Sequence, residues 1–303
     1  MMKMPFTSGR FGGFMRSLSC CLLLPILLVF AACGASASGD DDDDGPATDA
    51  RIDAISSDAN DLDFSKVYAH SGTVLYRLDT TTLLPVMIGP FANTGTQGIL
   101  DIAVDRNDRM LGITRDRVFE INTSTGAATL LTAITGMADL TSLSFVPTDL
   151  ANPNSAERLI AATDQGTVIE INQTSGVAAQ IGAYGSAAGG LISSSGDIVA
   201  VSGFGILATV NIGADDTAPD YLASINPTTW AATPLGTGTT YDKIFGIGFW
   251  KGKVYGFVDT ISGGAIIELN PNTGAATPVN TGAIRWFGAG VTTDAPIIGK
   301  PER

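Results

Sequence analysis

The stretch that decides the fold is residues 168–176, Val-Ile-Glu-Ile-Asn-Gln-Thr-Ser-Gly. It begins with the apolar and polar alternation of a half-buried β-strand and ends in residues that favour tight turns. The same pattern occurs in four other places, at Leu75–Asp79, Val118–Asn122, Leu222–Asn226 and Ile266–Asn270. The closing Asp or Asn residues are 43, 50, 54 and 44 residues apart. This period is the length of a four-stranded propeller blade.

Two other strands of each repeat are visible around this pattern. The small residues of one set suit the crowded innermost strand of a blade, and its members are Asp101–Val104, Ser142–Phe145, Gly190–Ser193, Gly246–Phe249 and Gly288–Val291. The other set is richer in branched and aromatic residues and is predicted to form the second strands, at Arg109–Ile113, Arg158–Ala162, Ile198–Val201 and Lys253–Phe257. Each repeat therefore supplies the strands of one blade.

The two ends of the repeat region complement each other. The last repeat supplies only an inner strand, within residues 285–292, whereas the first begins one strand late at Lys66-Val-Tyr-Ala, which matches Lys253-Val-Tyr-Gly. Joining them completes a fifth blade and leaves no blade short of a strand. We therefore predict an all-β, five-bladed β-propeller over residues 64–303. A β-sandwich or a β-solenoid with the same strand spacing is the alternative.

The turn sequences carry a family resemblance. Asn-Pro-Asn-Thr-Gly at 270–274 and Asn-Pro-Thr-Thr at 226–229 resemble the extracytoplasmic propeller repeats of the YVTN and NHL kind. The resemblance covers nearly all of residues 64–303. It implies a blade geometry and no particular chemistry.

Residues 1–32 have the pattern of an export signal. Lys3, Arg10 and Arg16 precede a short apolar run that is too short to span a membrane. The run ends in Phe-Ala-Ala-Cys-Gly at 30–34, which resembles the lipobox of bacterial lipoproteins. The resemblance implies removal of residues 1–32, attachment to a membrane through lipidated Cys33, and, from Gly34, delivery to the outer membrane of a Gram-negative cell envelope. An ordinary secretory signal is the alternative.

Residues 33–63 are predicted to form a disordered linker after the lipid anchor. They include five consecutive aspartates at 40–44 and few large apolar side chains, so they cannot bury enough surface to fold. The run lacks the spaced ligands of an EF-hand loop, which argues against a calcium site.

Composition excludes several classes of protein. The net charge of −13 leaves no basic surface for nucleic acid. Only 5 of the 30 acidic residues are Glu while Gly reaches 36, a balance that favours turns and strands over helices. With one His and no Cys after Cys33, zinc and copper sites are not expected, and no motif indicates a cofactor.

The starts of the inner strands share one face of a propeller with the loops between the second and third strands. This geometry selects a candidate ligand-binding set at the channel mouth, namely Gln97, Asp139, Tyr184, Tyr241, Asp242, Lys243, Arg285 and Trp286. The neighbouring loops add His70, Arg115, Asp116, Asp164 and Asp259. A mouth that mixes aromatic, acidic and basic side chains suits a sugar, a peptide end or another small polar ligand. The alternative is a solvated polar rim.

These features favour a binding or scaffolding module for an envelope glycan, peptide or protein over an enzyme. A hydrolase or lyase with Asp101, Asp139 and Asp242 as channel carboxylates is the alternative, as in five-bladed glycosidases. A structural surface protein with no specific ligand is a third hypothesis. Two long segments, Pro147–Glu157 and Gly203–Asp220, are either binding loops or neutral insertions, and the second is expected to hold an extra strand at Leu207–Ile212.

Overall fold

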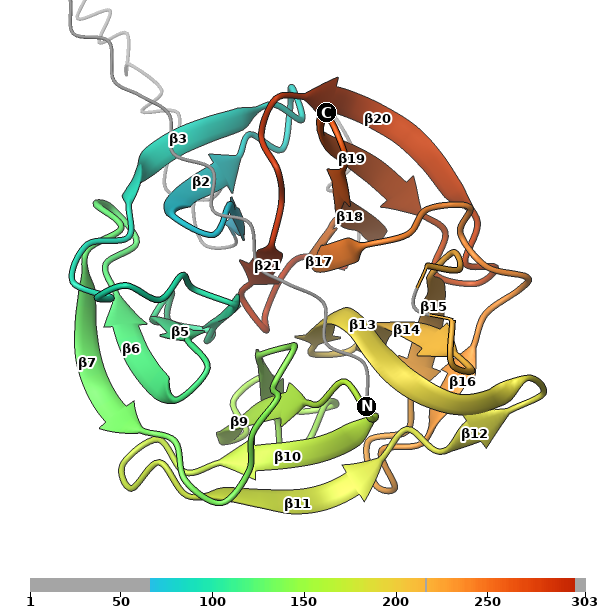
Figure 1. Cartoon of the computed structure of the whole chain (residues 1–303), viewed down its shortest axis with the longest axis horizontal. Helices are drawn as coiled ribbons and strands as arrows, with labels where there is room; N and C mark the ends of the chain where they lie inside the picture. Colours follow the sequence, from blue (N-terminus) through green and yellow to red (C-terminus); the bar gives the residue numbers. More distant parts are fainter. Residues whose placement is uncertain (1–65, 216, 298–303) are drawn as a thin grey trace, which may run out of the picture. The chain divides into compact units, whose positions relative to one another are not determined.

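The computed structural model describes residues 66–215 and 217–297, and all its secondary structure in these ranges is β-strand. The strands form five antiparallel sheets arranged as a ring (Figure 1). We number these sheets as blades 1 to 5. The predicted signal segment, Cys33 and the acidic linker lie outside the described residues.

The first three blades have four strands each, in the following order from the axis outward. Blade 1 contains β21 (Gly288–Val291), β1 (Val67–His70), β2 (Val74–Leu78) and β3 (Pro85–Pro90). Blade 2 contains β4 (Asp101–Val104), β5 (Met110–Ile113), β6 (Arg117–Ile121) and β7 (Ala128–Ala133). Blade 3 contains β8 (Ser144–Pro147), β9 (Glu157–Ala162), β10 (Thr167–Ile171) and β11 (Ala178–Ala183).

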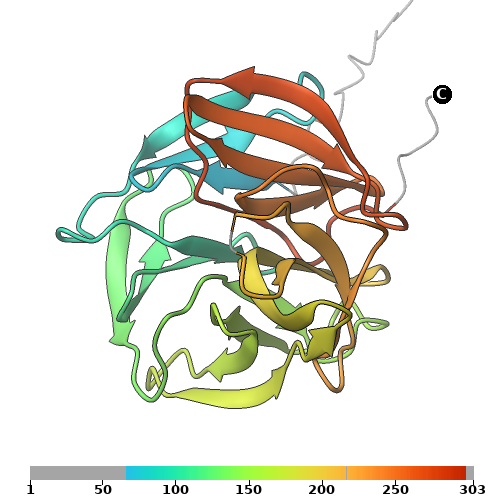
Figure 2. The ribbon, with the colours of Figure 1, turned by 45° about the vertical axis from the view of Figure 1, so that its right-hand side comes forward.

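Of the other two blades, one has an additional strand. Blade 4 has five strands, β12 (Ser186–Ala187), β13 (Gly190–Val201), β14 (Gly205–Ile212), β15 (Tyr221–Ile225) and β16 (Ala232–Pro234). Blade 5 has four, β17 (Ile244–Trp250), β18 (Lys253–Thr260), β19 (Gly263–Leu269) and β20 (Ala276–Gly282). Figure 2 shows the twist of the blade 5 strands, in orange and red.

The ring closes where the sequence predicted. β21, near the end of the described chain, pairs antiparallel with β1, and Val67 lies opposite Val291. The inner strands β21, β4, β8, β13 and β17 contact one another in turn around the axis. The five-bladed propeller is confirmed, and this closed ring is neither a sandwich nor a solenoid.

The strand assignment within blade 4 was wrong. Gly190–Ser193 and Ile198–Val201, predicted as inner and second strands, are two parts of β13. Leu207–Ile212, expected as an extra strand, belongs to β14, which is the second strand of the blade. The extra strand is β12, which pairs with the start of β13. An irregularity in register between Ser194 and Ile198 lets one long strand resemble two short ones in the sequence.

The repeated Asp or Asn residue has a local structural role. The Asn172 side chain accepts hydrogen bonds from the backbone N–H groups of Thr174 and Ser175, at 3.0 and 2.9 Å. Such Asx turns reverse the chain between the third and fourth strands, and equivalent bonds occur at Asp79, Asn122, Asn226 and Asn270. The turn then needs a positive φ, which Gly176 supplies at 71°.

Two enclosed carboxyl groups join the inner strands at the axis. Asp101 accepts hydrogen bonds from the N–H groups of Ile102 and Leu143, at 2.9 and 2.6 Å, which links blade 2 to blade 3. Asp197 accepts from Ile198 at 2.6 Å and from Ile247 at 2.8 Å, which links blade 4 to blade 5. Both side chains are fully buried, so these bonds are shielded from water.

The two carboxyl groups also lie close enough to affect each other's protonation. Burial, followed by the charge of Asp197, raises the pKa of Asp101 well above its ordinary value. Burial likewise raises the pKa of Asp197. A shared proton is the expected outcome for two adjacent carboxyl groups without solvent.

The backbone at residue 288 passes so close to the side chains of Asp101 and His70 that only glycine fits there. A Cβ atom there would fall inside the van der Waals radii of both Oδ1 of Asp101 and Nε2 of His70. Both side chains are fully buried in a closely packed interior, so neither can move into solvent to make room. The small residues of the inner strands therefore reflect crowding at the axis.

The Gly288→Ala substitution is expected to lower the free energy of unfolding by about 1–3 kcal/mol because it overpacks the axis. Gly282→Ala is the matched control, since Gly282 is also a strand glycine but its Cβ would meet no atom within 4 Å. Chemical denaturation measures both variants. Equal stability of the two would contradict the proposed crowding.

Candidate functional site

Five of the residues selected from the sequence gather beside blade 5. The backbone N–H of Asp259 donates to the carbonyl of Lys243, and Nζ of Lys243 lies 3.7 Å from Oδ2 of Asp242. Arg285 donates from Nε and Nη2 to the two carboxylate oxygens of Asp259, at 2.7 and 2.6 Å. Tyr241 is half-buried and packs against the hydrophobic core beneath. The loops before β17 and β21 and the end of β18 thus form one charged cluster.

Two aromatic rings border this cluster. The Phe287 and Phe245 ring centroids are 6.0 Å apart, and the guanidinium carbon of Arg285 lies 5.9 Å from the Phe287 centroid. Phe287 keeps 38% of its surface exposed. The bidentate contact with Asp259 fixes the guanidinium, although the Arg285 side chain is 57% exposed. Neither phenylalanine was selected from the sequence, although Phe287 immediately precedes β21 and Phe245 is the second residue of β17.

The remaining exposed candidates lie on other blades. Asp139 and Asp164 are neighbours, since the Asp164 N–H donates to the Asp139 carbonyl at 3.3 Å. Gln97 is exposed between β3 and β4, and Arg115 and Asp116 are exposed between β5 and β6. Within the described residues, no hydrogen bond or ion pair joins any of these five to the blade 5 cluster. The predicted set is therefore spread around the rim.

Three other predicted residues are buried. Trp286 has 2% of its surface exposed and packs edge-on against Tyr76 and Phe257, so it belongs to the core. Tyr184 is also enclosed, its hydroxyl has no partner, and burial and the nearby Asp197 raise its pKa. Burial lowers the pKa of His70 to about 4, and its Nδ1 donates to the Ser71 carbonyl at 2.7 Å.

The three carboxylates proposed as catalytic, Asp101, Asp139 and Asp242, do not lie together in one site. Asp101 faces Asp197 in the sealed axis, whereas Asp139 is exposed and Asp242 lies beside Lys243. Within the described residues, no three His, Cys, Asp or Glu side chains gather as a metal site. Asp197 was not selected from the sequence. A signal was present, because Asp197-Ile198 within β13 repeats the Asp101-Ile102 pair that begins β4.

A second missed carboxyl group, Asp220, lies under the blade 5 cluster. Its Oδ2 accepts a hydrogen bond from the Ile244 N–H at 2.7 Å, and its backbone N–H donates to the Tyr241 carbonyl. Burial and, to a smaller extent, the charge of Asp242 raise the pKa of Asp220 to about 7, while the Ile244 hydrogen bond and Lys243 oppose the shift. The protonation of Asp220 therefore changes near neutral pH, directly beneath residues 241–243.

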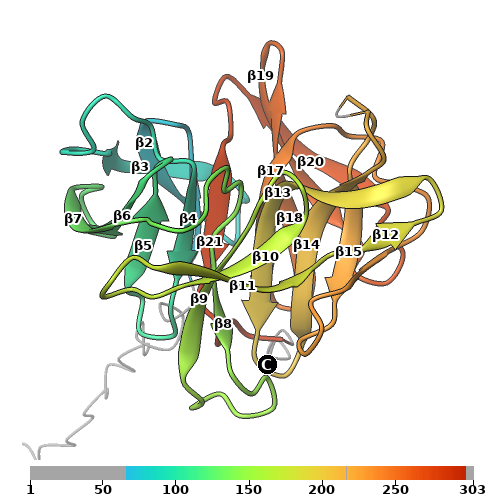
Figure 3. The same cartoon turned by 60° about the horizontal axis from the view of Figure 1, so that its bottom comes forward.

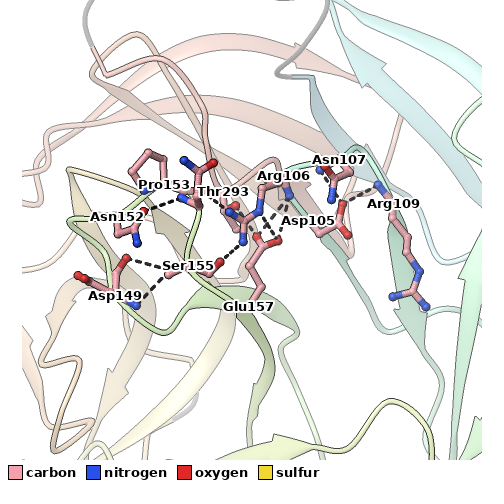
Figure 4. Close-up of polar contacts among 11 residues, drawn as sticks. Asp105, Arg106, Asn107, Arg109, Asp149, Asn152, Pro153, Ser155, Glu157 and Thr293 are labelled. Atoms are coloured by element: carbon pink, nitrogen blue, oxygen red, sulfur yellow. Dashed lines mark hydrogen bonds and ion pairs between the residues drawn. The ribbon is translucent and has the colours of Figure 1, made fainter.

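The long segment between β8 and β9 is held rigidly on the opposite face. Arg106 donates to the carbonyl groups of Pro153 and Ser155 and contacts the Glu157 carboxylate (Figure 4). Glu157 also accepts a hydrogen bond from the Thr293 hydroxyl. Figure 3 shows this β8–β9 segment projecting away from the tip between β18 and β19. These contacts connect three blades and favour a structural role for Pro147–Glu157.

The structure includes no helix, in residues 66–215 and 217–297, that is long and apolar enough to cross a membrane.

No protein-family model matches the chain, and no curated protein matches it. Among solved structures, a chain of the nidogen/laminin complex is similar at 10% identity and a TM-score of 0.46, covering 75% of this chain and 98% of that one. TolB from Acinetobacter baumannii is similar at 14% identity and a TM-score of 0.44, covering 75% and 54%. BamB from Moraxella catarrhalis is similar at 11% identity and a TM-score of 0.32, covering 71% and 69%.

The chain spans about half the length of TolB and of a Bacteroides thetaiotaomicron protein of unknown function. These identities are too low to carry a function from any of these proteins to this chain.

The raised pKa of Asp220 predicts a pH-dependent stability. The folded protein binds a proton at Asp220 between about pH 4 and 7, where the unfolded chain has lost it, so this group makes the protein less stable as pH rises through that window. The Asp220→Asn variant keeps the acceptor for Ile244 and loses the charge. Its melting temperature is expected to match the wild type near pH 4 and to exceed it near pH 8. A difference that stays constant with pH would contradict this assignment.

Proposed function

We propose that this protein is a lipid-anchored binding module of the cell envelope. In this proposal residues 1–32 are removed on export, Cys33 carries the lipid, and residues 34–63 separate the propeller from the outer membrane. The support is the signal pattern, the Phe-Ala-Ala-Cys-Gly sequence and the acidic composition of the segment that follows. A lipoprotein of this kind would hold a rigid propeller at a membrane surface.

The observation that carries the binding role is the fixed Arg285 guanidinium beside the exposed Phe287 ring. Arginine and aromatic residues dominate the energetics of protein interfaces, and a preorganised side chain loses little entropy when a partner binds. The fully exposed Ile261 lies two residues after Asp259, on the tip between β18 and β19. We therefore place a peptide or protein partner at this part of the channel mouth, with Arg285 and Phe287 as its main contacts.

A hydrolase or lyase has less support. Asp101 is fully buried and its oxygens accept two backbone N–H groups, so a substrate would have to displace bonds that hold the ring together. The binding proposal needs only side chains that are already at the surface.

The binding proposal is tested by affinity capture from the native envelope, with the tagged mature protein as bait. The Arg285→Ala, Phe287→Ala double variant is expected to retain its partner at least tenfold less well than the wild type. Trp286 is left intact because it is a core residue. Arg117→Ala, Leu130→Ala is the matched control, since it removes an exposed base and an exposed apolar side chain from blade 2. Equal retention by all three baits, or by none, would contradict the proposal.

A further inference from the structure

Blade 4 has one strand more than the other blades. Its inner strand β13 has 12 residues, whereas the inner strands of the other blades have four or seven. The added part of β13 pairs with β12 to form a hairpin, in which Ser186 lies opposite Leu191 and Ala187 opposite Gly190 (Figure 1, yellow). Additions to a rigid repeated scaffold commonly carry binding sites.

This hairpin forms one wall of a cleft of about 750 Å³. The hairpin contributes Gly189, Gly190 and Leu191. The turn between β9 and β10 contributes Asp164 and Gln165, and the end of β14 with the two residues after it contributes Asn211, Gly213 and Ala214. A volume of this size is within the range of small-molecule sites. The cleft shares only Asp164 with the residues selected from the sequence, and it is separate from the Arg285 and Phe287 contacts.

The polar groups of the cleft define what it can bind. The Oδ1 atom of Asn211, a lining residue, is buried and has no hydrogen-bond partner in the described chain. A buried polar atom without a partner costs free energy, and a ligand recovers it when the Asn211 side chain turns so that the amide meets the cleft. Gln165 and Ser193 add an amide and a hydroxyl group to the lining, whereas the Ser194 hydroxyl donates to the Gly196 carbonyl. The lining therefore offers both donors and acceptors.

Charge and shape narrow the ligand class. Among the described lining residues, Asp164 alone is charged, so an anionic ligand would meet a carboxylate and no base. None of these lining residues is aromatic, and Gly189, Gly190 and Gly213 leave backbone exposed on the walls. Asp164 disfavours an anion, and recognition of a neutral ligand in this cleft depends on hydrogen bonds rather than on ring stacking.

We propose that the blade 4 cleft binds a neutral, hydroxyl-rich saccharide of one or two rings. Each sugar hydroxyl both donates and accepts, so one hydroxyl can pair with Asn211 while others pair with Asp164, Gln165 and the exposed backbone. The proposal does not depend on the partner proposed for the channel mouth, because the residues that carry the two sites differ.

The probes are neutral disaccharides, namely maltose, cellobiose and chitobiose, with glucuronic acid as the anionic counterpart. Ligand-observed NMR on the full mature protein is expected to show binding of at least one neutral disaccharide and none of glucuronic acid. Absence of binding by all three neutral sugars at millimolar concentration, or equal binding of glucuronic acid, would overturn the proposal.

Two variants locate the binding. Ala214→Phe fills the cleft from an exposed position, and Asn211→Leu removes the unpartnered amide; each is expected to raise Kd at least tenfold. Ala151→Phe places the same side chain in the exposed β8–β9 segment and is expected to leave Kd unchanged. Thermal melting confirms that each variant is folded. If a folded Ala214→Phe protein binds the sugar as the wild type does, the site is not this cleft.

Discussion

The hydrogen bonds of the two axial carboxyl groups are the constraint on which the ring depends. Asp101 and Asp197 each accept a backbone N–H group from a neighbouring blade. Their burial makes these bonds strong and makes any loss of a partner costly. The same crowding explains the glycine at 288. Asp101 and Asp197 are fully buried, whereas the side chains on which the proposed functions depend lie on the rim and in the hairpin added to blade 4.

The parts of the fold that depend on local chemistry could be predicted from the sequence. An Asx turn such as that of Asn172 requires an Asp or Asn, so the repetition of this residue identified the blades. The positive φ that follows is less restrictive, since Gly176 supplies it in one blade and Leu83 and Trp230 adopt it in two others. Blade 4 was misread because the irregularity before Ile198 made one strand resemble two. The site was harder to predict, since burial depends on packing between blades. Trp286 occupies a loop position beside exposed Arg285, yet its ring turns into the core.

The arrangement suggests a division of labour in the proposed lipoprotein. The anchor and acidic linker would set the distance of the propeller from the membrane. The propeller would present two different surfaces. The Arg285 and Phe287 cluster is preorganised by an ion pair and suits a macromolecular partner, whereas the blade 4 cleft is walled by backbone and hydroxyl groups and suits a small neutral ligand. Asp220 contacts the backbone of Tyr241 and Ile244, so its titration near neutral pH occurs beneath the loop that carries Asp242 and Lys243.

The most direct test of an envelope-anchored propeller is mass spectrometry of the mature protein extracted from membranes of its native cells. We expect that the N-terminal residue is Cys33, that residues 1–32 are absent, and that the cysteine carries the added mass of acyl chains. An unmodified Cys33, or a mature chain that begins at another residue, would contradict the lipid anchor and would require a different explanation for the acidic segment at 34–63.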